Sequence, residues 1–186
     1  MRIFIAALLP QEIKKHIALY LDSIKDRVSG VKWESSEKLH ITLKFLGDIK
    51  DSKLSKIDDK LTSSTLGKSK IKLRLSNFGG FPSLYRPKIL YVGFSESPAI
   101  VDLQHTIDSG LQEIGFERDK RKFIPHVTIG RVKSKFKITA PLPIIEEKIF
   151  SIETIAVVRS FMDNRGSEYE NLSVYQLKLR LFTISK

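Results

Sequence analysis

The sequence contains no cysteine and no apolar run long enough to cross a membrane. Without cysteine there can be no disulfide, thiolate metal site or cysteine nucleophile, so any chemistry must use histidine, hydroxyl, carboxylate or basic side chains. A membrane-spanning helix needs about 20 consecutive apolar residues. The apolar segment Met1–Leu9 is shorter than this, and charged residues follow it too closely for a secretory signal. We therefore expect a cytoplasmic protein that makes no contact with a membrane.

Acidic residues are few relative to basic ones. The 186 residues include 21 Asp and Glu against 32 Lys and Arg, which gives a formal net charge of +11. Clustered positive charge concentrates polyanions and speeds their capture, so nucleic acid is the leading candidate for a partner. A lysine-rich surface that is merely solvated would give the same composition. Charge alone says nothing about catalysis.

One short pattern occurs twice. Residues 39–43 read Leu-His-Ile-Thr-Leu, and residues 125–129 read Pro-His-Val-Thr-Ile. Side chains alternate between the two faces of a β-strand, so in each copy the histidine and the threonine share one face while the aliphatic residues share the other. Two such strands facing each other would form a site with two imidazoles and two hydroxyls, from His40, Thr42, His126 and Thr128.

The rest of the chain predicts helices and strands that support these two motifs. Apolar residues recur at helical spacing in residues 11–28, 51–65 and 98–114. Short apolar or alternating runs predict strands in residues 2–8, 71–75, 89–94 and 148–161. The motifs lie 126 − 40 = 86 residues apart, close to half the chain, which suggests internal duplication of a helix-plus-antiparallel-sheet lobe. We expect a single two-lobed α+β domain over residues 1–186.

The paired motif suits displacement at phosphorus. Two imidazoles with pKa values near neutrality can hold opposite protonation states, so one accepts a proton while the other donates one. The two threonine hydroxyls can donate hydrogen bonds to the nonbridging phosphate oxygens. A catalytic zinc site would need three protein ligands, and neither motif supplies a third histidine or a carboxylate at ligand spacing. Neither a glycine-rich phosphate loop nor a serine nucleophile elbow is present.

The two motifs, with RIFIAALLP at residues 2–10 and FPSLYRPKILYVGF at residues 81–94, resemble the 2H phosphoesterase superfamily. The resemblance is to its RNA 2′,3′-cyclic phosphodiesterases, once named 2′-5′ RNA ligases. It implies two pseudo-symmetric lobes, antiparallel sheets lining a central cleft with helices outside, no metal or other cofactor, and hydrolysis of a terminal 2′,3′-cyclic phosphate to a 2′-phosphomonoester. By motif position, His40 would be the proton donor to the departing 3′-oxygen and His126 the proton acceptor that activates water.

Other side chains near the motifs are candidate ligands. Every second side chain of a strand lies on the same face, so Lys44 is expected on the face of His40 and Thr42. There it either extends a cationic cleft floor that binds phosphate or is simply solvated. Arg131 lies five residues after His126, so regular alternation would place the two side chains on opposite faces of the strand. A β-bulge would bring Arg131 onto the face of His126, where it could bind phosphate. The charged run at residues 118–122 is either a solvated turn or a basic rim facing the substrate. Four aromatic residues could stack a nucleobase, although core packing is the more common fate: Trp33, Phe81, Tyr85 and Tyr91.

Three functions remain open at this point. The first is the cyclic phosphodiesterase, acting as a monomer on RNA with a 2′,3′-cyclic phosphate end or on a small cyclic nucleotide. The second is a module that binds RNA ends without turnover, although binding alone would be served by lysine and arginine. The third is the reverse reaction, which joins RNA ends through a 2′-5′ bond.

Overall fold

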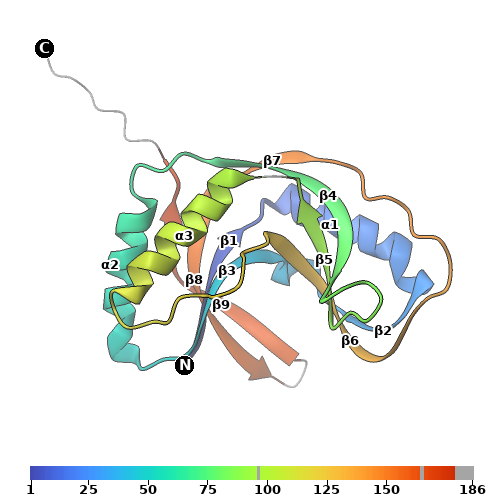
Figure 1. Cartoon of the computed structure of the whole chain (residues 1–186), viewed down its shortest axis with the longest axis horizontal. Helices are drawn as coiled ribbons and strands as arrows, with labels where there is room; N and C mark the ends of the chain where they lie inside the picture. Colours follow the sequence, from blue (N-terminus) through green and yellow to red (C-terminus); the bar gives the residue numbers. More distant parts are fainter. Residues whose placement is uncertain (96, 164–165, 179–186) are drawn as a thin grey trace, which may run out of the picture.

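The computed structural model describes residues 1–95, 97–163 and 166–178 (Figure 1). Within these residues the chain forms three α-helices, three short 3-10 helices and nine strands. The strands are β1 (Arg2–Leu8), β2 (Val28–Trp33), β3 (His40–Asp48), β4 (Ile71–Phe81), β5 (Ile89–Phe94), β6 (His126–Ile138), β7 (Ile149–Ile152), β8 (Thr154–Asp163) and β9 (Gly166–Gln176). The helices are α1 (Gln11–Ile24), α2 (Leu54–Thr65) and α3 (Pro98–Gln112), with 3-10 turns η1 (Lys25–Arg27), η2 (Ser36–Lys38) and η3 (Asp51–Lys53).

All nine strands join one curled antiparallel sheet. Their order is β7-β4-β5-β6-β3-β1-β8-β9, with β2 paired to the outer part of β6. The two motif strands, β3 and β6, are therefore neighbours at the centre of the sheet. Each motif strand pairs with a strand that precedes it along the chain, β1 with β3 and β5 with β6, and a helix lies between the two strands of each pair. This repeated arrangement confirms the α+β fold with two pseudo-symmetric lobes.

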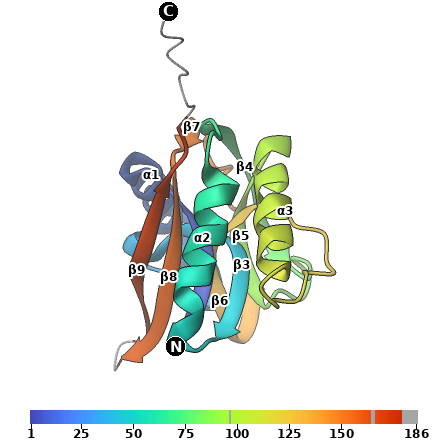
Figure 2. The same ribbon diagram turned by 90° about the vertical axis from the view of Figure 1, so that its left-hand side faces the viewer.

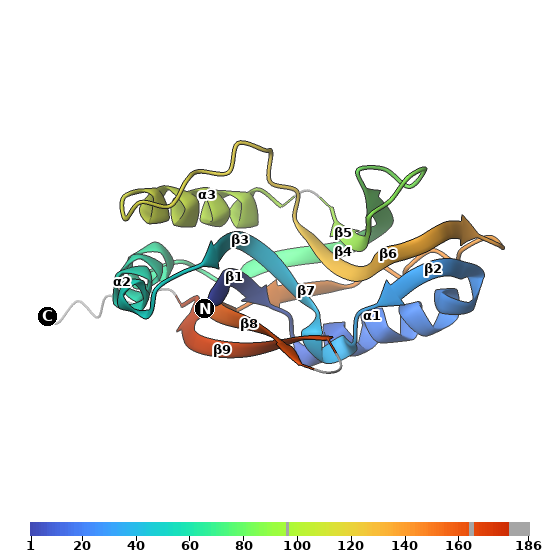
Figure 3. The same ribbon diagram turned by 90° about the horizontal axis from the view of Figure 1, so that it is seen from below.

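The helices pack their apolar stripes against the sheet at two ends of the molecule. Helix α1 lies at one end, whereas α2 and α3 lie side by side at the other, with α2 next to β9 (Figures 2 and 3). The buried residues of α1 follow the spacing of one helix face: Ile13, Ile17, Tyr20, Leu21 and Ile24. This helix is shorter than the sequence predicted, because Val28 already belongs to β2.

The two faces of the central strands have different partners. Ile41 and Val127 point into the main hydrophobic core and are fully buried. A second, small apolar cluster lies on the other face of β1 and β8 and includes Phe4, Ala6 and Val158. No helix among the described residues is both long enough and apolar enough to span a bilayer.

Candidate active site

The two motif strands contact each other at a single antiparallel pair, Ile41 of β3 and Val127 of β6. Because neighbouring residues of an antiparallel pair oppose each other in reverse order, this register places each histidine opposite the threonine of the other motif. His40 and His126 are thus related by a local two-fold axis through the pair. Both lie on the face opposite the core, which we call the site face.

Each histidine is held in the same way. The Nδ1 atom of His40 is 2.6 Å from the carbonyl oxygen of Lys38, and that of His126 is 2.7 Å from the carbonyl oxygen of Ile124. A carbonyl only accepts hydrogen bonds, so Nδ1 carries the proton in both rings. The atom left to exchange a proton with a substrate is therefore Nε2 in both residues.

His40 is the more enclosed of the two. Its ring stacks on Phe4 at 4.8 Å between centroids and meets the edge of Tyr169 at 5.4 Å. Its Nε2 lies 3.1 Å from Oγ1 of Thr42, which donates its hydroxyl hydrogen when the imidazole is neutral. The pKa of His40 is lowered to about 4, chiefly by burial and also by positive charge on Lys14, Arg131 and His126, while the hydrogen bond to the Lys38 carbonyl opposes this shift.

His126 sits among a second aromatic pair. The rings of Phe81 and Tyr91 lie 4.9 and 5.5 Å from its imidazole and stack on each other at 4.4 Å. Burial lowers the pKa of His126 as well, while the hydrogen bond to the carbonyl of Ile124 raises it. Both imidazoles are therefore mainly neutral at pH 7 when no anion is bound.

Both motif strands carry a β-bulge just after the threonine. Pairing with the neighbouring strand leaves one residue unmatched, Leu43 in β3 and Ile129 in β6. A bulge reverses the alternation of the side chains beyond it. Arg131 is thereby brought to the exposed site face, where its charge acts on His40 and its Nε lies 3.3 Å from Oε1 of Glu34. Binding of phosphate by Arg131 stays a prediction.

The same kind of bulge turns Lys44 away from the site. Its side chain is 4% exposed and forms a buried ion pair with Asp108 of α3, and it donates to the carbonyl oxygen of Glu117 at 2.7 Å. The expectation that Lys44 extends a cationic cleft floor is therefore wrong. Asp108 also accepts from Nε of Arg118 at 3.3 Å, so this network connects the first motif strand to the segment that leads into the second.

Comparison with known proteins agrees with this geometry. Residues 8–91 match the family described as LigT-like phosphoesterases. An RNA 2′,3′-cyclic phosphodiesterase of Archaeoglobus fulgidus is 31% identical over 180 residues, covering 95% of this chain and 100% of that protein. The protein of the same name from Methanothermobacter thermautotrophicus is 27% identical over 182 residues, with 95% and 98% coverage.

The chain belongs to the LigT-like phosphoesterase family of the 2H superfamily. The fold is shared with the protein TT0787 of Thermus thermophilus, at a TM-score of 0.82, 23% identity, and coverage of 97% of this chain and 100% of that one. It is also shared with LigT of Escherichia coli in a complex with 3′-AMP, at a TM-score of 0.80, 20% identity, and 95% and 97% coverage. The expectation of a phosphoesterase is confirmed.

The sequence missed part of the site of this LigT-like phosphoesterase. Tyr169 and Phe4 enclose His40, and neither was predicted to do so. Tyr169 lies 129 residues from His40 in the chain and reaches it only because β9 stands at the edge of the same sheet. Of the predicted stacking residues, Phe81 and Tyr91 border the site, whereas Trp33 packs on the core and Tyr85 is 86% exposed.

The described residues contain no group of three or more His, Asp or Glu side chains placed to hold a metal ion. In both motif histidines, Nδ1 bonds a backbone carbonyl, so only Nε2 of each ring is left that could bind a metal ion. Two imidazole nitrogens and hydroxyls are a poor donor set for a catalytic metal site, which typically uses three protein ligands.

Proposed function

We propose that this LigT-like phosphoesterase hydrolyses the terminal 2′,3′-cyclic phosphate of RNA to a 2′-phosphomonoester, with His40 and His126 as a metal-independent acid/base pair. The observation that carries the proposal is the antiparallel pair of Ile41 and Val127, whose register places both imidazoles and both hydroxyls on one face. The names of the relatives from Archaeoglobus and Methanothermobacter support the class of substrate.

The reaction needs one base and one acid on opposite sides of phosphorus. Nε2 of His126 accepts a proton from water as the water oxygen bonds to phosphorus. The bond from phosphorus to the 3′-oxygen breaks, and the protonated Nε2 of His40 gives its proton to that oxygen. The 2′-oxygen keeps the phosphate, and the protein ends with the proton on the other histidine.

The threonines stabilise the charge that shifts onto the nonbridging oxygens. In the free protein the hydroxyl of Thr42 is bonded to Nε2 of His40. A bound phosphate oxygen offers this hydroxyl a charged acceptor, which gives a stronger hydrogen bond than a neutral one. By moving to the phosphate, Thr42 releases Nε2 of His40 for proton transfer, and Thr128 occupies the equivalent position in the second motif.

The substrate also supplies the charge that makes His40 an acid. Without substrate, burial and neighbouring positive charges hold the pKa of His40 at about 4. A cyclic phosphate diester carries one negative charge, which favours an imidazolium within about 4–6 Å. Binding of substrate therefore raises the pKa of this histidine and of His126 toward neutrality, where one of the two can hold a proton.

Product analysis with a defined oligonucleotide tests this function. An RNA oligonucleotide with a terminal 2′,3′-cyclic phosphate, incubated with the protein in excess EDTA, should yield only the 2′-phosphomonoester, identified by phosphorus NMR. The same oligonucleotide with a 3′-phosphate serves as the control and should be unchanged. A 3′-phosphate product, or loss of activity in EDTA that a divalent ion restores, would contradict the proposal.

The reverse reaction is tested in the same experiment. An acceptor RNA with a free 5′-hydroxyl is added, and a joined 2′-5′ product is sought by gel electrophoresis. Water at bulk concentration competes with the acceptor, so hydrolysis should dominate. If the protein binds the oligonucleotide but leaves its end unchanged, the binding-module alternative replaces the enzyme.

A further inference from the structure

The outer half of β6 carries a row of basic side chains that begins at the site. Four basic residues occupy alternate positions of this strand, and all of them are exposed: Arg131, Lys133, Lys135 and Lys137. Two residues between them, Val132 and Phe136, pack against the hydrophobic core. Because neighbouring side chains of a strand point to opposite faces, the basic residues on either side of these two point away from the core. We call the four basic residues the β6 stripe.

The β6 stripe has little acidic compensation. Within the described residues, none of its three lysines forms an ion pair, and only Arg131 reaches a carboxylate, that of Glu34 at 3.3 Å. The neighbouring strand adds a further positive charge, because Lys32 of β2 is paired with Arg131 and is also exposed. Like charges on adjacent positions of a sheet repel each other. An anion that binds along the stripe would relieve this repulsion.

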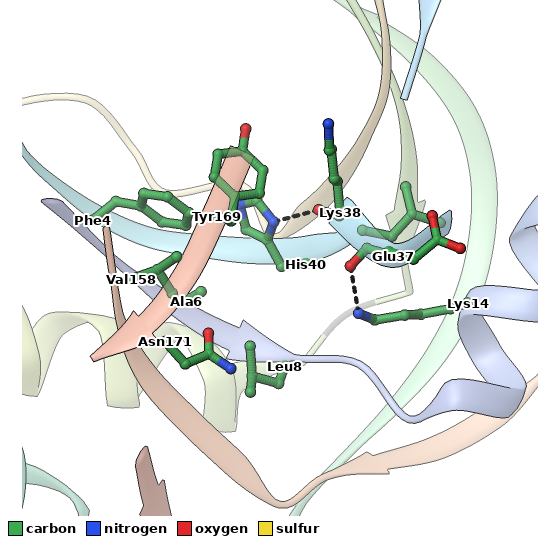
Figure 4. Close-up of a pocket in the computed structure, with 11 residues that line it drawn as sticks. Phe4, Ala6, Leu8, Lys14, Glu37, Lys38, His40, Val158, Tyr169 and Asn171 are labelled. Atoms are coloured by element: carbon green, nitrogen blue, oxygen red, sulfur yellow. Dashed lines mark hydrogen bonds between the residues drawn. The ribbon is translucent and has the colours of Figure 1, made fainter. Parts of the chain in front are cut away.

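The basic side chains around the pocket at His40 differ from the stripe, because protein atoms already bind them. Lys14 donates to the carbonyl oxygen of Glu37 at 2.8 Å (Figure 4), and Lys38 forms an ion pair with Glu168 at 2.8 Å. No residue of the β6 stripe lines this pocket. The stripe is therefore a surface separate from the pocket, and its lysines are available to a ligand.

The spacing of the stripe suits an extended nucleic-acid strand. Side chains two residues apart on a β-strand are separated by about 6.5 Å along the strand, which is close to the spacing of successive phosphates in an extended single strand. The ladder with β2 is irregular beside Lys135, where Gly30 has a φ of +79°. A Cβ atom on Gly30 would lie 2.4 Å from the carbonyl oxygen of Lys135, so this approach requires glycine.

An exposed aromatic residue lies beside the stripe. The loop between β4 and β5 ends at Lys88, whose carbonyl oxygen accepts a hydrogen bond from the backbone N–H of Val132 at 3.0 Å. This bond holds the loop next to the outer half of β6 (Figures 1 and 3). In the middle of the loop, Tyr85 is 86% exposed, and the guanidinium carbon of Arg86 lies 5.9 Å from its ring centroid. Basic side chains beside an exposed aromatic ring are typical of surfaces that bind single-stranded nucleic acid.

We propose that the β6 stripe binds the phosphate backbone of single-stranded RNA upstream of the cyclic end, and that Tyr85 stacks on one of its bases. The proposal rests on the proposed function, which puts the cyclic phosphate between His40 and His126. From that end the RNA extends only on its 5′ side, and the stripe starts at Arg131 and leads away from the site. The basic segment at residues 118–122 precedes His126 and is not part of the stripe, so separate variants test the two surfaces.

A triple variant tests the stripe: Lys133→Ala, Lys135→Ala and Lys137→Ala. Arg131 is kept, because it lies in the site. The matched control removes three exposed lysines in or near α2 and at the start of β4, away from the stripe: Lys56→Ala, Lys68→Ala and Lys72→Ala. The probes are a single-stranded RNA of about twelve nucleotides, which fits the site sizes of single-strand binding surfaces, and a dinucleotide. Both end in a 2′-phosphate, and fluorescence anisotropy gives their dissociation constants between about 50 and 200 mM salt.

We expect the triple stripe variant to lower the slope of log binding against log salt by about 2 for the longer RNA, because each lysine contact with single-stranded phosphate contributes about 0.7. Binding of the dinucleotide should be unchanged, as should binding of both probes by the control variant. An equal decrease in the two triple variants, or no decrease in the stripe variant, would overturn the proposal.

Tyr85→Ala tests the stacking contact. It should weaken binding of the longer RNA by at least about fivefold and leave the salt slope unchanged, because stacking involves no phosphate. Phe161→Ala is the control, since Phe161 is also exposed, lies on β8 and has Arg159 at 5.6 Å from its ring centroid. A duplex of the same sequence hides the faces of its bases and should bind more weakly than the single strand. Equal binding of duplex and single strand, or equal losses in Tyr85→Ala and Phe161→Ala, would contradict the proposal.

Turnover of a 2′,3′-cyclic mononucleotide separates this inference from the proposed function, because the mononucleotide has no upstream phosphates. The triple stripe variant should hydrolyse it at the wild-type rate. A wild-type protein that leaves the mononucleotide unchanged but loses salt slope in the stripe variant keeps the RNA surface and loses the proposed function. Normal hydrolysis together with an unchanged salt slope in the stripe variant keeps the proposed function and overturns the RNA surface.

Discussion

Ile41 and Val127 form the one direct backbone pair between β3 and β6, and both side chains are fully buried. Because side chains alternate along a strand, burying these two places the histidine and threonine of each motif on the opposite face. A shift of the register by one residue would turn both imidazoles into the core. The same hydrophobic contact that stabilises the sheet therefore also assembles the site.

The lowered histidine pKa values predict an acidic optimum for kcat/KM. This constant reports the free protein, in which burial lowers both pKa values below 6.5 and that of His40 to about 4. The productive form has one protonated and one neutral imidazole, so kcat/KM should peak below pH 6.5 and fall as the pH rises further. The pH profile is measured with a 2′,3′-cyclic mononucleotide.

The kcat profile should lie at higher pH than that of kcat/KM. It reports the complex, in which the bound phosphate anion raises both pKa values. Profiles that coincide, or a kcat/KM that keeps rising to pH 9, would mean that the two histidines do not form the acid/base pair.

The Lys44–Asp108 ion pair should matter for stability. Both side chains are 4% exposed, so Lys44→Met or Asp108→Asn leaves one buried group without its partner. Each single change should lower the free energy of unfolding by about 3–5 kcal/mol, whereas replacing both by Met and Leu should cost much less. Urea denaturation measures both quantities.

The exposed pair Lys25–Asp22, with side chains 49% and 64% exposed, provides the control. Asp22→Asn should cost less than about 1 kcal/mol. If the single changes at Lys44 and Asp108 cost no more than this, the buried network does not support the site.

The basic segment before the second motif should contact the RNA chain. Arg118 is tied to Asp108, whereas Lys120 and Lys122 are exposed. Each contact of a lysine with single-stranded phosphate contributes about 0.7 to the slope of log binding against log salt. Lys120→Ala with Lys122→Ala should therefore reduce the salt slope of kcat/KM for a long oligonucleotide by about 1.4, and leave a mononucleotide unaffected.

The control for this prediction removes the same charge elsewhere, with Lys68→Ala and Lys72→Ala near the start of β4. An equal change in slope for both double variants would show that the segment is not a specific contact. Shallow, parallel curves for long and short substrates would favour a small cyclic nucleotide as the substrate.

The sequence predicted the features that depend on local alternation. The strands that carry His40 and His126 and the faces of their threonines follow from residue order alone, as does the helix stripe of α1. Lys44 was misplaced because the bulge at Leu43 leaves no trace in the alternation of apolar residues. The surroundings of the histidines depend on the sheet order, which sets Tyr169 and Asn171 of β9 near His40 and Tyr91 of β5 near His126. Long-range strand order of this kind has no short sequence signature.

The central claim is that His40 and His126 transfer protons in one step, and the turnover of their alanine variants tests it most directly. His16 and His105 are the controls, because the ring of His16 bonds the carbonyl of Glu146 outside the site, and His105 is exposed on α3. With a cyclic phosphate oligonucleotide, His40→Ala and His126→Ala should each lower kcat by about 10² to 10⁴ while RNA binding stays nearly intact. The fold-loss of kcat in the double variant should be smaller than the product of the two single fold-losses. The control variants should keep full activity. Wild-type turnover by either single variant would contradict the account.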